Sequence, residues 1–282
     1  MTALYVVLIV LCILAVLVAV YFLLIMPRVC KKPDVSMFKQ HLYAHRGLFD
    51  NETDAPENSM KAFVKAVEAG FGIEMDVQLT KDKQAVVFHD GKLMRMCGAK
   101  GNVSDYTYEE LGSFTLANSE EKIPLFKDVL KMIDGRVPLI IEYKIEDTNP
   151  EVCEIGNEIL KEYQGIYCIE SFNPFGVLWY KKHRPDIVRG QLSEKFWKND
   201  NKKLLIYWIV GNLLTNFATK PDFVAYNALH YDNLSRRICR KFYKNLAVTW
   251  TIKSQEQLDA LRNEFDLFIF DSFVPDPDYM KE

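Results

Sequence analysis

The sequence predicts an α/β protein built as a TIM (β/α)8 barrel, with a small insertion after the second strand and one transmembrane helix ahead of the barrel. Two patterns indicate the barrel: about eight apolar runs of strand length alternate with helical stretches, and charged residues repeatedly stand where such a run ends. The length of 282 residues suits a single barrel, which typically needs about 250. We therefore divide the chain into an anchor (1–28), a linker (29–40) and a barrel domain (41–282).

The anchor is predicted from an uncharged, mostly aliphatic stretch between Ala3 and Met26. A helix of about 24 residues, rising 1.5 Å per residue, would cross the roughly 30 Å hydrocarbon layer. A cleaved signal peptide is the alternative, but its apolar region would be shorter and would follow a basic segment. Because Arg28, Lys31 and Lys32 follow the stretch and no charged side chain precedes it, we expect a single-pass membrane protein with a cytoplasmic barrel. An outward-facing barrel is the alternative.

Composition narrows the function classes. The net charge of −3 shows no basic bias of the kind nucleic-acid binders carry, so we expect no nucleic-acid partner. The six cysteines are scattered, without C-x-x-C pairs, and are expected to be reduced thiols. Reduced thiols agree with a cytoplasmic barrel.

The barrel elements follow in order from residue 41. The Asn58 side chain is expected to cap the first helix, Gly70 to end it, and Lys81–Lys83 to turn the second strand into a short hairpin partner. Predicted strands lie at 41–45, 71–79, 85–88, 137–143, 166–172, 187–192, 223–228, 247–252 and 267–270. Predicted helices lie at 58–68, 125–133, 151–163, 174–183, 204–218, 232–243 and 254–263.

Two segments depart from the simple alternation. Residues 91–122 are rich in Gly, Ser, Asn and Thr, with one short helical stretch at 108–114, and are predicted to be the insertion. The segment 204–218 is apolar on all sides yet too short to span a bilayer. It is expected either to lie on the membrane or to be a barrel helix buried under the insertion.

Carboxylates at strand ends predict a metal site. In E-M-D (Glu74–Asp76) the two acids are two residues apart, so both side chains of a strand point to one face, and E-Y-K (Glu142–Lys144) repeats this spacing. Glu74, Asp76 and Glu142 would make an oxygen site suited to a divalent cation, Mg²⁺ or Ca²⁺, or Mn²⁺. Surface charge is the alternative, but an outward-facing barrel position lies under a helix, where an unpaired charge is costly.

Two histidines and two cations stand beside these acids. His45 in A-H-R-G and His89 in F-H-D are predicted to be an acid and base pair, since only imidazole titrates near neutral pH without perturbation; structural histidines are the alternative. Arg46 and Lys144 would neutralise phosphate oxygens, or else pair with the carboxylates. Together these residues indicate a metal-assisted phosphodiester site.

Two aromatic residues near strand ends, Phe172 and Trp250, complete the predicted site. They would form an apolar wall for the alcohol or acyl part of a substrate, as aromatic side chains commonly do in pockets. Ordinary barrel packing is the alternative.

The motifs resemble, in order, those of the glycerophosphodiester phosphodiesterase family: A-H-R-G, P-E-N-S, E-M-D-V-Q-L-T-K-D, F-H-D, I-E-Y-K, S-F-N-P and V-T-W-T, between about Leu42 and Pro275. The resemblance implies the barrel fold, the acid and base roles of His45 and His89, Arg46 and Lys144 on phosphate, and a metal on Glu74, Asp76 and Glu142. It also implies hydrolysis of a glycerophosphodiester to glycerol phosphate and an alcohol, through attack of the glycerol hydroxyl and a cyclic phosphate.

Two stretches depart from the family pattern. Residues 94–101 (M-R-M-C-G-A-K-G) lack the Thr that commonly follows the Arg, and F-D-S-F at 270–273 replaces a common T-D. Neither touches the predicted metal or acid and base residues.

Three other interpretations of the site compete. A lysophospholipid could replace the soluble glycerophosphodiester as substrate, which the anchor favours. A catalytically silent barrel that binds phosphorylated head groups would not require a paired acid and base. A glycoside hydrolase would need two carboxylates about 5 to 9.5 Å apart and would have no use for Arg46 and Lys144.

Overall fold

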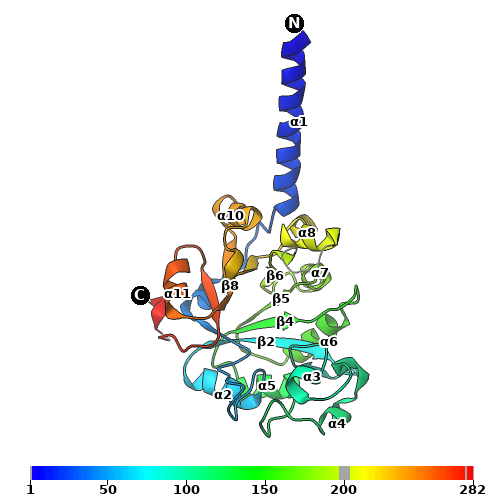
Figure 1. Ribbon diagram of the computed structural model, residues 1–282, viewed down its shortest axis with the longest axis vertical. Helices are drawn as coiled ribbons and strands as arrows, with labels where there is room; N and C mark the ends of the chain where they lie inside the picture. Colours follow the sequence, from blue (N-terminus) through cyan, green and yellow to red (C-terminus); the bar gives the residue numbers. More distant parts are fainter. Residues whose placement is uncertain (1, 197–203, 277, 282) are drawn as a thin grey trace.

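The computed structural model describes residues 2–196, 204–276 and 278–281, and its centre is a closed barrel of parallel strands (Figure 1). The strands pair in the order β1-β9-β8-β7-β6-β5-β4-β2, and β1 also pairs with β2, which closes the ring. The strands are β1 (Tyr43–His45), β2 (Gly72–Leu79), β4 (Leu139–Tyr143), β5 (Tyr167–Ser171), β6 (Arg189–Ser193), β7 (Phe223–Asn227), β8 (Leu246–Ile252) and β9 (Leu267–Phe270). The predicted eightfold barrel is confirmed.

The strand β3 (Ala85–Val87) is an antiparallel partner of β2, as the hairpin turn predicts. Helices cover the outside of the barrel. They are α2 (Met60–Glu68), α5 (Phe126–Ile133), α6 (Glu151–Leu160), α7 (Pro174–His183), α8 (Leu205–Gly211), α9 (Asn216–Thr219), α10 (Leu234–Lys241) and α11 (Gln255–Leu261), with short 3-10 turns at η4 (Ala228–His230) and η5 (Tyr279–Lys281). Their apolar faces bury the largest core cluster against the strands.

The insertion forms a small layer of its own after β3. It contains α3 (Met94–Cys97), η2 (Val103–Asp105) and α4 (Tyr108–Leu111). Side chains such as Leu93, Met96, Leu111 and Leu116 bury a separate apolar cluster against Phe88. The insertion is therefore packed, and it lies far from α8 (Figure 1).

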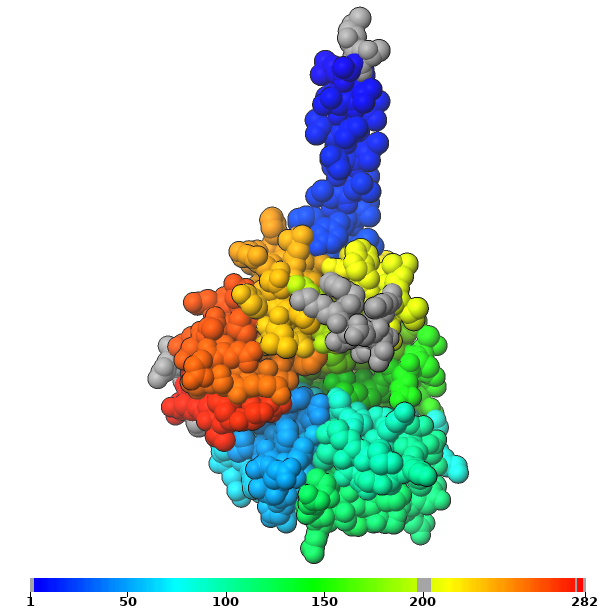
Figure 2. Space-filling model, in the orientation of Figure 1, coloured from blue at the N-terminus to red at the C-terminus, as the bar shows by residue number. Residues whose placement is uncertain are grey.

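The helix α1 (Thr2–Ile25) projects from the barrel (Figures 1 and 2). Residues Ala3–Ile25 are long and apolar enough to cross a membrane, and their most apolar window is unburied. The predicted linker segment lies against the barrel. Its 3-10 helix η1 (Ser36–Gln40) buries Phe38 beside Tyr43, whose hydroxyl donates to the Phe38 carbonyl at 3.0 Å.

Two local expectations were wrong. Ser59, not Asn58, caps α2, because Ser59 has the extended backbone of a cap residue and accepts from the Ala62 amide, while Asn58 is left-handed (φ 57°). The expected helix 204–218 is two short helices, α8 and α9, because Leu213 between them is left-handed (φ 60°). An apolar pattern on all sides gives no signal for such a break.

Candidate active site

All nine residues predicted for the site lie around the carboxyl ends of the barrel strands. A cavity of about 50 Å³ there is lined by His45, Arg46, Glu74, His89, Glu142, Glu170, Phe172, Leu192, Trp250 and Ile269. Asp76 and Lys144 contact the residues that line it. An adjoining cavity of about 450 Å³ shares Glu142 and Phe172, and most of the residues that line it are charged or polar. The small cavity suits an ion and its ligands, and the larger one has room for a substrate.

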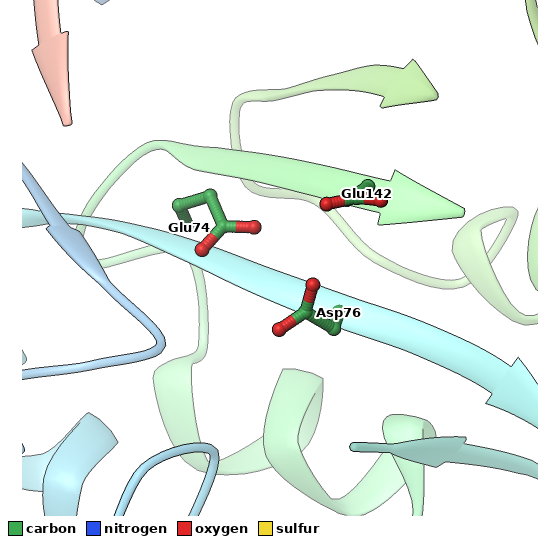
Figure 3. Close-up of side chains that lie close together, drawn as sticks. All are labelled: Glu74, Asp76 and Glu142. Carbon is green, nitrogen blue, oxygen red and sulfur yellow. The ribbon is translucent and has the colours of Figure 1, made fainter. Parts of the chain in front are cut away.

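Three carboxylates meet at the small cavity, with Glu74 and Glu142 in its lining and Asp76 beside them (Figure 3). Glu74 and Asp76 point inward from β2, and Glu142 points toward them from β4, because Asp76 and Glu142 are partners in the register of the two strands. One oxygen from each lies within 4.8 Å of the others, and all three side chains are buried. Such an all-oxygen group could hold a divalent cation.

A fourth buried carboxylate, Glu170 at the end of β5, adds negative charge. It is the register partner of Glu142, it is 1% exposed, and one of its oxygens has no hydrogen-bond partner among the described residues. Burial, followed by the charges of neighbouring carboxylates, raises the pKa of Glu74 and of Glu170 well above the usual range. A divalent cation fits this excess of negative charge. Glu170 was not among the predicted site residues, although its place in I-E-S-F at a predicted strand end was a signal.

Lys144 lies between two of the metal candidates. Its ammonium is 2.8 Å from Asp76 Oδ1 and 2.7 Å from Glu142 Oε1. In this structure Lys144 thus pairs with the carboxylates, which was the alternative to a phosphate contact. Burial raises the pKa of Asp76, but the charges of Lys144, His89 and Arg46 outweigh burial and hold that pKa well below its usual range. Of the three predicted metal ligands, Asp76 is therefore the one whose neighbours favour its ionised form.

Arg46 is held in place by a second acid that the sequence analysis did not assign. Its backbone is left-handed (φ 59°), its Nη1 is 2.7 Å from Glu57 Oε1, and its Nε is 3.4 Å from Asp76 Oδ2. Glu57 also receives two hydrogen bonds from Arg95 of the insertion, at 2.7 and 2.8 Å. Burial opposes ionisation of Glu57, yet these arginines lower its pKa to about 2. The P-E-N-S motif was the signal for Glu57, and the Arg of M-R-M-C-G-A-K-G was the signal for Arg95.

Each histidine is oriented by an aspartate. His45 Nδ1 lies 2.9 Å from Asp271 Oδ2, and His89 Nδ1 lies 2.6 Å from Asp90 Oδ1. A carboxylate at Nδ1 favours the tautomer with the proton on Nδ1, which leaves Nε2 of His45 able to accept a proton. That Nε2 faces Glu74 Oε2 at 3.9 Å. Asp271 follows β9 directly and belongs to F-D-S-F, so the expectation that this stretch touches none of the acid and base residues was wrong.

The two predicted aromatic residues contact each other and begin a row. The rings of Phe172 and Trp250 lie 5.4 Å apart at 87°, and Phe172 also meets Phe196 at 5.7 Å. Phe196 in turn lies 5.7 Å from Tyr207 in α8. The row thus leads from the small cavity to α8.

Comparisons with known proteins agree with this geometry. Residues 45–271 match the glycerophosphoryl diester phosphodiesterase family. A glycerophosphodiester phosphodiesterase from Bacillus altitudinis is 36% identical over 164 residues, which are 54% of this chain and 66% of the relative. A human lysophospholipase D is 32% identical over 160 residues, which are 52% of this chain and 49% of the relative. The matched part is thus about two thirds of one relative's length and half of the other's.

A solved structure shares the fold. A phosphodiesterase from Oleispira antarctica, determined in complex with the product sn-glycerol-3-phosphate, superposes with a TM-score of 0.67 at 22% identity, covering 86% of this chain and 95% of that one. The barrel, the residues at its carboxyl end and the match over residues 45–271 lead to one conclusion: the chain belongs to the glycerophosphoryl diester phosphodiesterase family.

Proposed function

We propose that the protein is a metal-dependent phosphodiesterase that hydrolyses glycerophosphodiesters to glycerol phosphate and an alcohol. The observation that carries the proposal is that His45 and His89 line the same cavity as Glu74 and Glu142, with Arg46 beside them. A binding protein for phosphorylated head groups would need the cations but not two oriented imidazoles.

Glu74, Asp76 and Glu142 would hold the metal, Mg²⁺ or Ca²⁺, since both prefer oxygen ligands. When bound, such a cation polarises a phosphoryl oxygen and lowers the pKa of a coordinated hydroxyl or water. Arg46 is placed to neutralise negative charge on the phosphoryl group, because Glu57 and Asp76 fix its guanidinium near the cavity.

The histidines would exchange protons with the substrate. Burial, only partly opposed by Asp271, lowers the pKa of His45, so that its imidazole is neutral and its Nε2 can accept the proton of the attacking hydroxyl. His89, oriented by Asp90, would supply the proton to the leaving oxygen. Lys144 would remain a fixed positive charge between Asp76 and Glu142.

A second candidate substrate is a lysophospholipid. The aromatic row from Trp250 through Phe172 and Phe196 to Tyr207 offers an apolar path for an acyl chain, and α1 would keep the enzyme at the membrane. The charged and polar residues that make up most of the lining of the adjoining cavity instead favour a soluble glycerophosphodiester. We further propose that α1 spans the membrane once, with Arg28, Lys31 and Lys32 placing the barrel in the cytoplasm.

The test is release of choline by the full chain in detergent, from glycerophosphocholine and separately from lysophosphatidylcholine; the first leaves glycerol phosphate and the second leaves lysophosphatidate. Each substrate is offered with Mg²⁺, with Ca²⁺ and with a chelator. Metal-dependent release would support the proposed reaction, and the faster substrate would decide between the two candidates. No release by folded, metal-loaded protein would favour a silent binding barrel.

A further inference from the structure

The end of α1 is fixed to the barrel by contacts that begin within the last turns of the helix. The Tyr21 hydroxyl lies 2.8 Å from Ser235 Oγ in α10, and the Tyr243 hydroxyl donates to the Phe22 carbonyl at 2.9 Å. The side-chain amide of Asn216 in α9 donates to the carbonyl of Ile25, which is fully buried. The direction of α1 therefore sets how the barrel is oriented toward a membrane.

Arg28 extends this attachment just after the helix. Its guanidinium is 3.3 Å from the Asp222 carboxylate, a side chain only 2% exposed, and it also donates to the Pro185 carbonyl at 3.1 Å. A buried acid paired with the first charge after α1 gives the junction a defined geometry.

Ring contacts set the depth of α10. The 24 residues of α1 are about 36 Å long, slightly more than the roughly 30 Å hydrocarbon layer, so its last turns would lie at the bilayer surface. Phe22 in those turns meets Phe242, just after α10, edge to face at 5.5 Å. Phe242 must then lie at the same depth as Phe22, where aromatic side chains are favoured.

Exposed apolar side chains surround this point. α8 and α10 lie on either side of the foot of α1 (Figures 1 and 2). The exposed fractions of Leu205, Phe242 and Leu234 are 70%, 69% and 64%, and Trp208 and Phe217 are about half exposed, at 49% and 52%. We call the outer surface of α8, α9 and α10, with Phe242, the α8–α10 face.

Basic residues adjoin the apolar ones. Arg237, Lys241 and Lys244 are exposed on or just after α10, and with Lys32 they line a cavity of about 450 Å³. The Lys32 ammonium is held there by the Tyr243 and Lys244 carbonyls. Exposed aromatic and aliphatic side chains beside lysine and arginine are typical of a surface that lies on anionic lipid.

We propose that the α8–α10 face rests in the headgroup layer of the bilayer that α1 spans, with its apolar side chains reaching the acyl boundary and its basic residues on anionic headgroups. The barrel is then held on its side against the membrane, with the end of the aromatic row at Tyr207 close to the lipid. The inference rests on the proposed membrane-spanning role of α1.

The test uses Trp208 as a reporter in the full chain, reconstituted into vesicles of phosphatidylcholine and phosphatidylglycerol. Bromine atoms on the acyl chains quench tryptophan only at contact range. The Trp208 emission, taken as the difference between wild type and Trp208→Phe, should fall by about half in brominated vesicles, because a docked side chain lies about 5–10 Å into the headgroup and acyl boundary. Trp179→Phe is the control, since Trp179 in α7 packs on Tyr180 and His183, and the emission that this variant loses should be the same in brominated and unbrominated vesicles.

A third variant separates docking from anchoring. Tyr5→Trp places a reporter within α1, and its added emission should be quenched whenever α1 is in the bilayer. Quenching of this added emission without quenching of Trp208 would overturn the proposed docking while leaving the anchor intact; absence of both would overturn the anchor and the docking together. Neither outcome depends on whether the protein hydrolyses phosphodiesters.

Discussion

Replacing Asp271 by Asn tests whether His45 acts through a positioned imidazole. The carboxylate lies 2.9 Å from His45 Nδ1 and its side chain is 8% exposed. Burial raises the pKa of Asp271, but the hydrogen bond from His45 and the contact with Ser272 lower it to about 2, so Asp271 is ionised at neutral pH. Asn keeps the shape and removes the charge.

The expected loss follows from the strength of that contact. A hydrogen bond involving a charged group contributes about 1.5–3 kcal/mol. If this interaction is made fully only when His45 carries the proton in the transition state, kcat should fall roughly 10- to 100-fold, since about 1.4 kcal/mol is tenfold in rate. The pKa of His45 should also fall further, because the hydrogen bond to Asp271 is the largest of the effects that raise it. The limb of the pH profile of kcat/KM that reports His45 would then move to lower pH.

The assay is release of glycerol phosphate across a pH series by wild type, Asp271→Asn and Ser272→Ala. Ser272 donates to the other Asp271 oxygen at 2.6 Å, so its variant is the matched control: it removes a neighbour of Asp271 but keeps the carboxylate that faces His45. Ser272→Ala should therefore keep the wild-type pH limb. Wild-type turnover and an unmoved limb in Asp271→Asn, with its fold intact by melting temperature, would refute the reasoning.

Four further substitutions give distinct outcomes. His45→Ala should abolish turnover and leave Mg²⁺ or Ca²⁺ binding intact, whereas Glu74→Ala should abolish turnover and weaken that binding. Calorimetric titration of the cation, run beside the turnover assay, separates the two variants. Activity in either variant would contradict the role proposed for the replaced residue. Gly190→Ala should lower the unfolding free energy by about 1–3 kcal/mol, because an added Cβ would overlap the Phe223 ring, and an unchanged melting temperature would count against that packing. The pKa of Glu57 is about 2 in the folded protein and about 4.3 in an unfolded chain. Ionised Glu57 therefore stabilises the fold at pH above about 4.3, and this stabilisation is lost as the pH falls toward 2. The difference in unfolding free energy between wild type and Glu57→Gln should therefore shrink by up to about 3 kcal/mol from pH 4.5 to pH 2, and a constant difference would exclude the linkage.

The sequence was enough to predict the barrel and which side chains meet at the carboxyl ends of its strands. Strand periodicity is a local property, so the spacing of Glu74 and Asp76 already placed both carboxylates on one face of β2. The position of His45 and Glu142 at the ends of apolar runs then brought them to the same edge, because parallel strands of a barrel share their carboxyl ends. The apolar α1 was equally evident from composition.

The partners that orient these residues were decided by the tertiary structure. His45 and Asp271 are 226 positions apart, and they meet only because β9 returns beside β1 to close the barrel. Arg95 reaches Glu57 because the insertion folds back on its own small core, and no periodicity in the insertion predicts that.

The sequence was likewise not enough to predict how the α8–α10 face is assembled. Residue patterns indicated an apolar segment at 204–218, but not the break at Leu213 or the contact of Phe242 with Phe22. Local pattern determines which residues form an element and which face it buries. Long-range packing decides which elements meet, because the free energy of each such contact depends on two segments that are far apart in the chain.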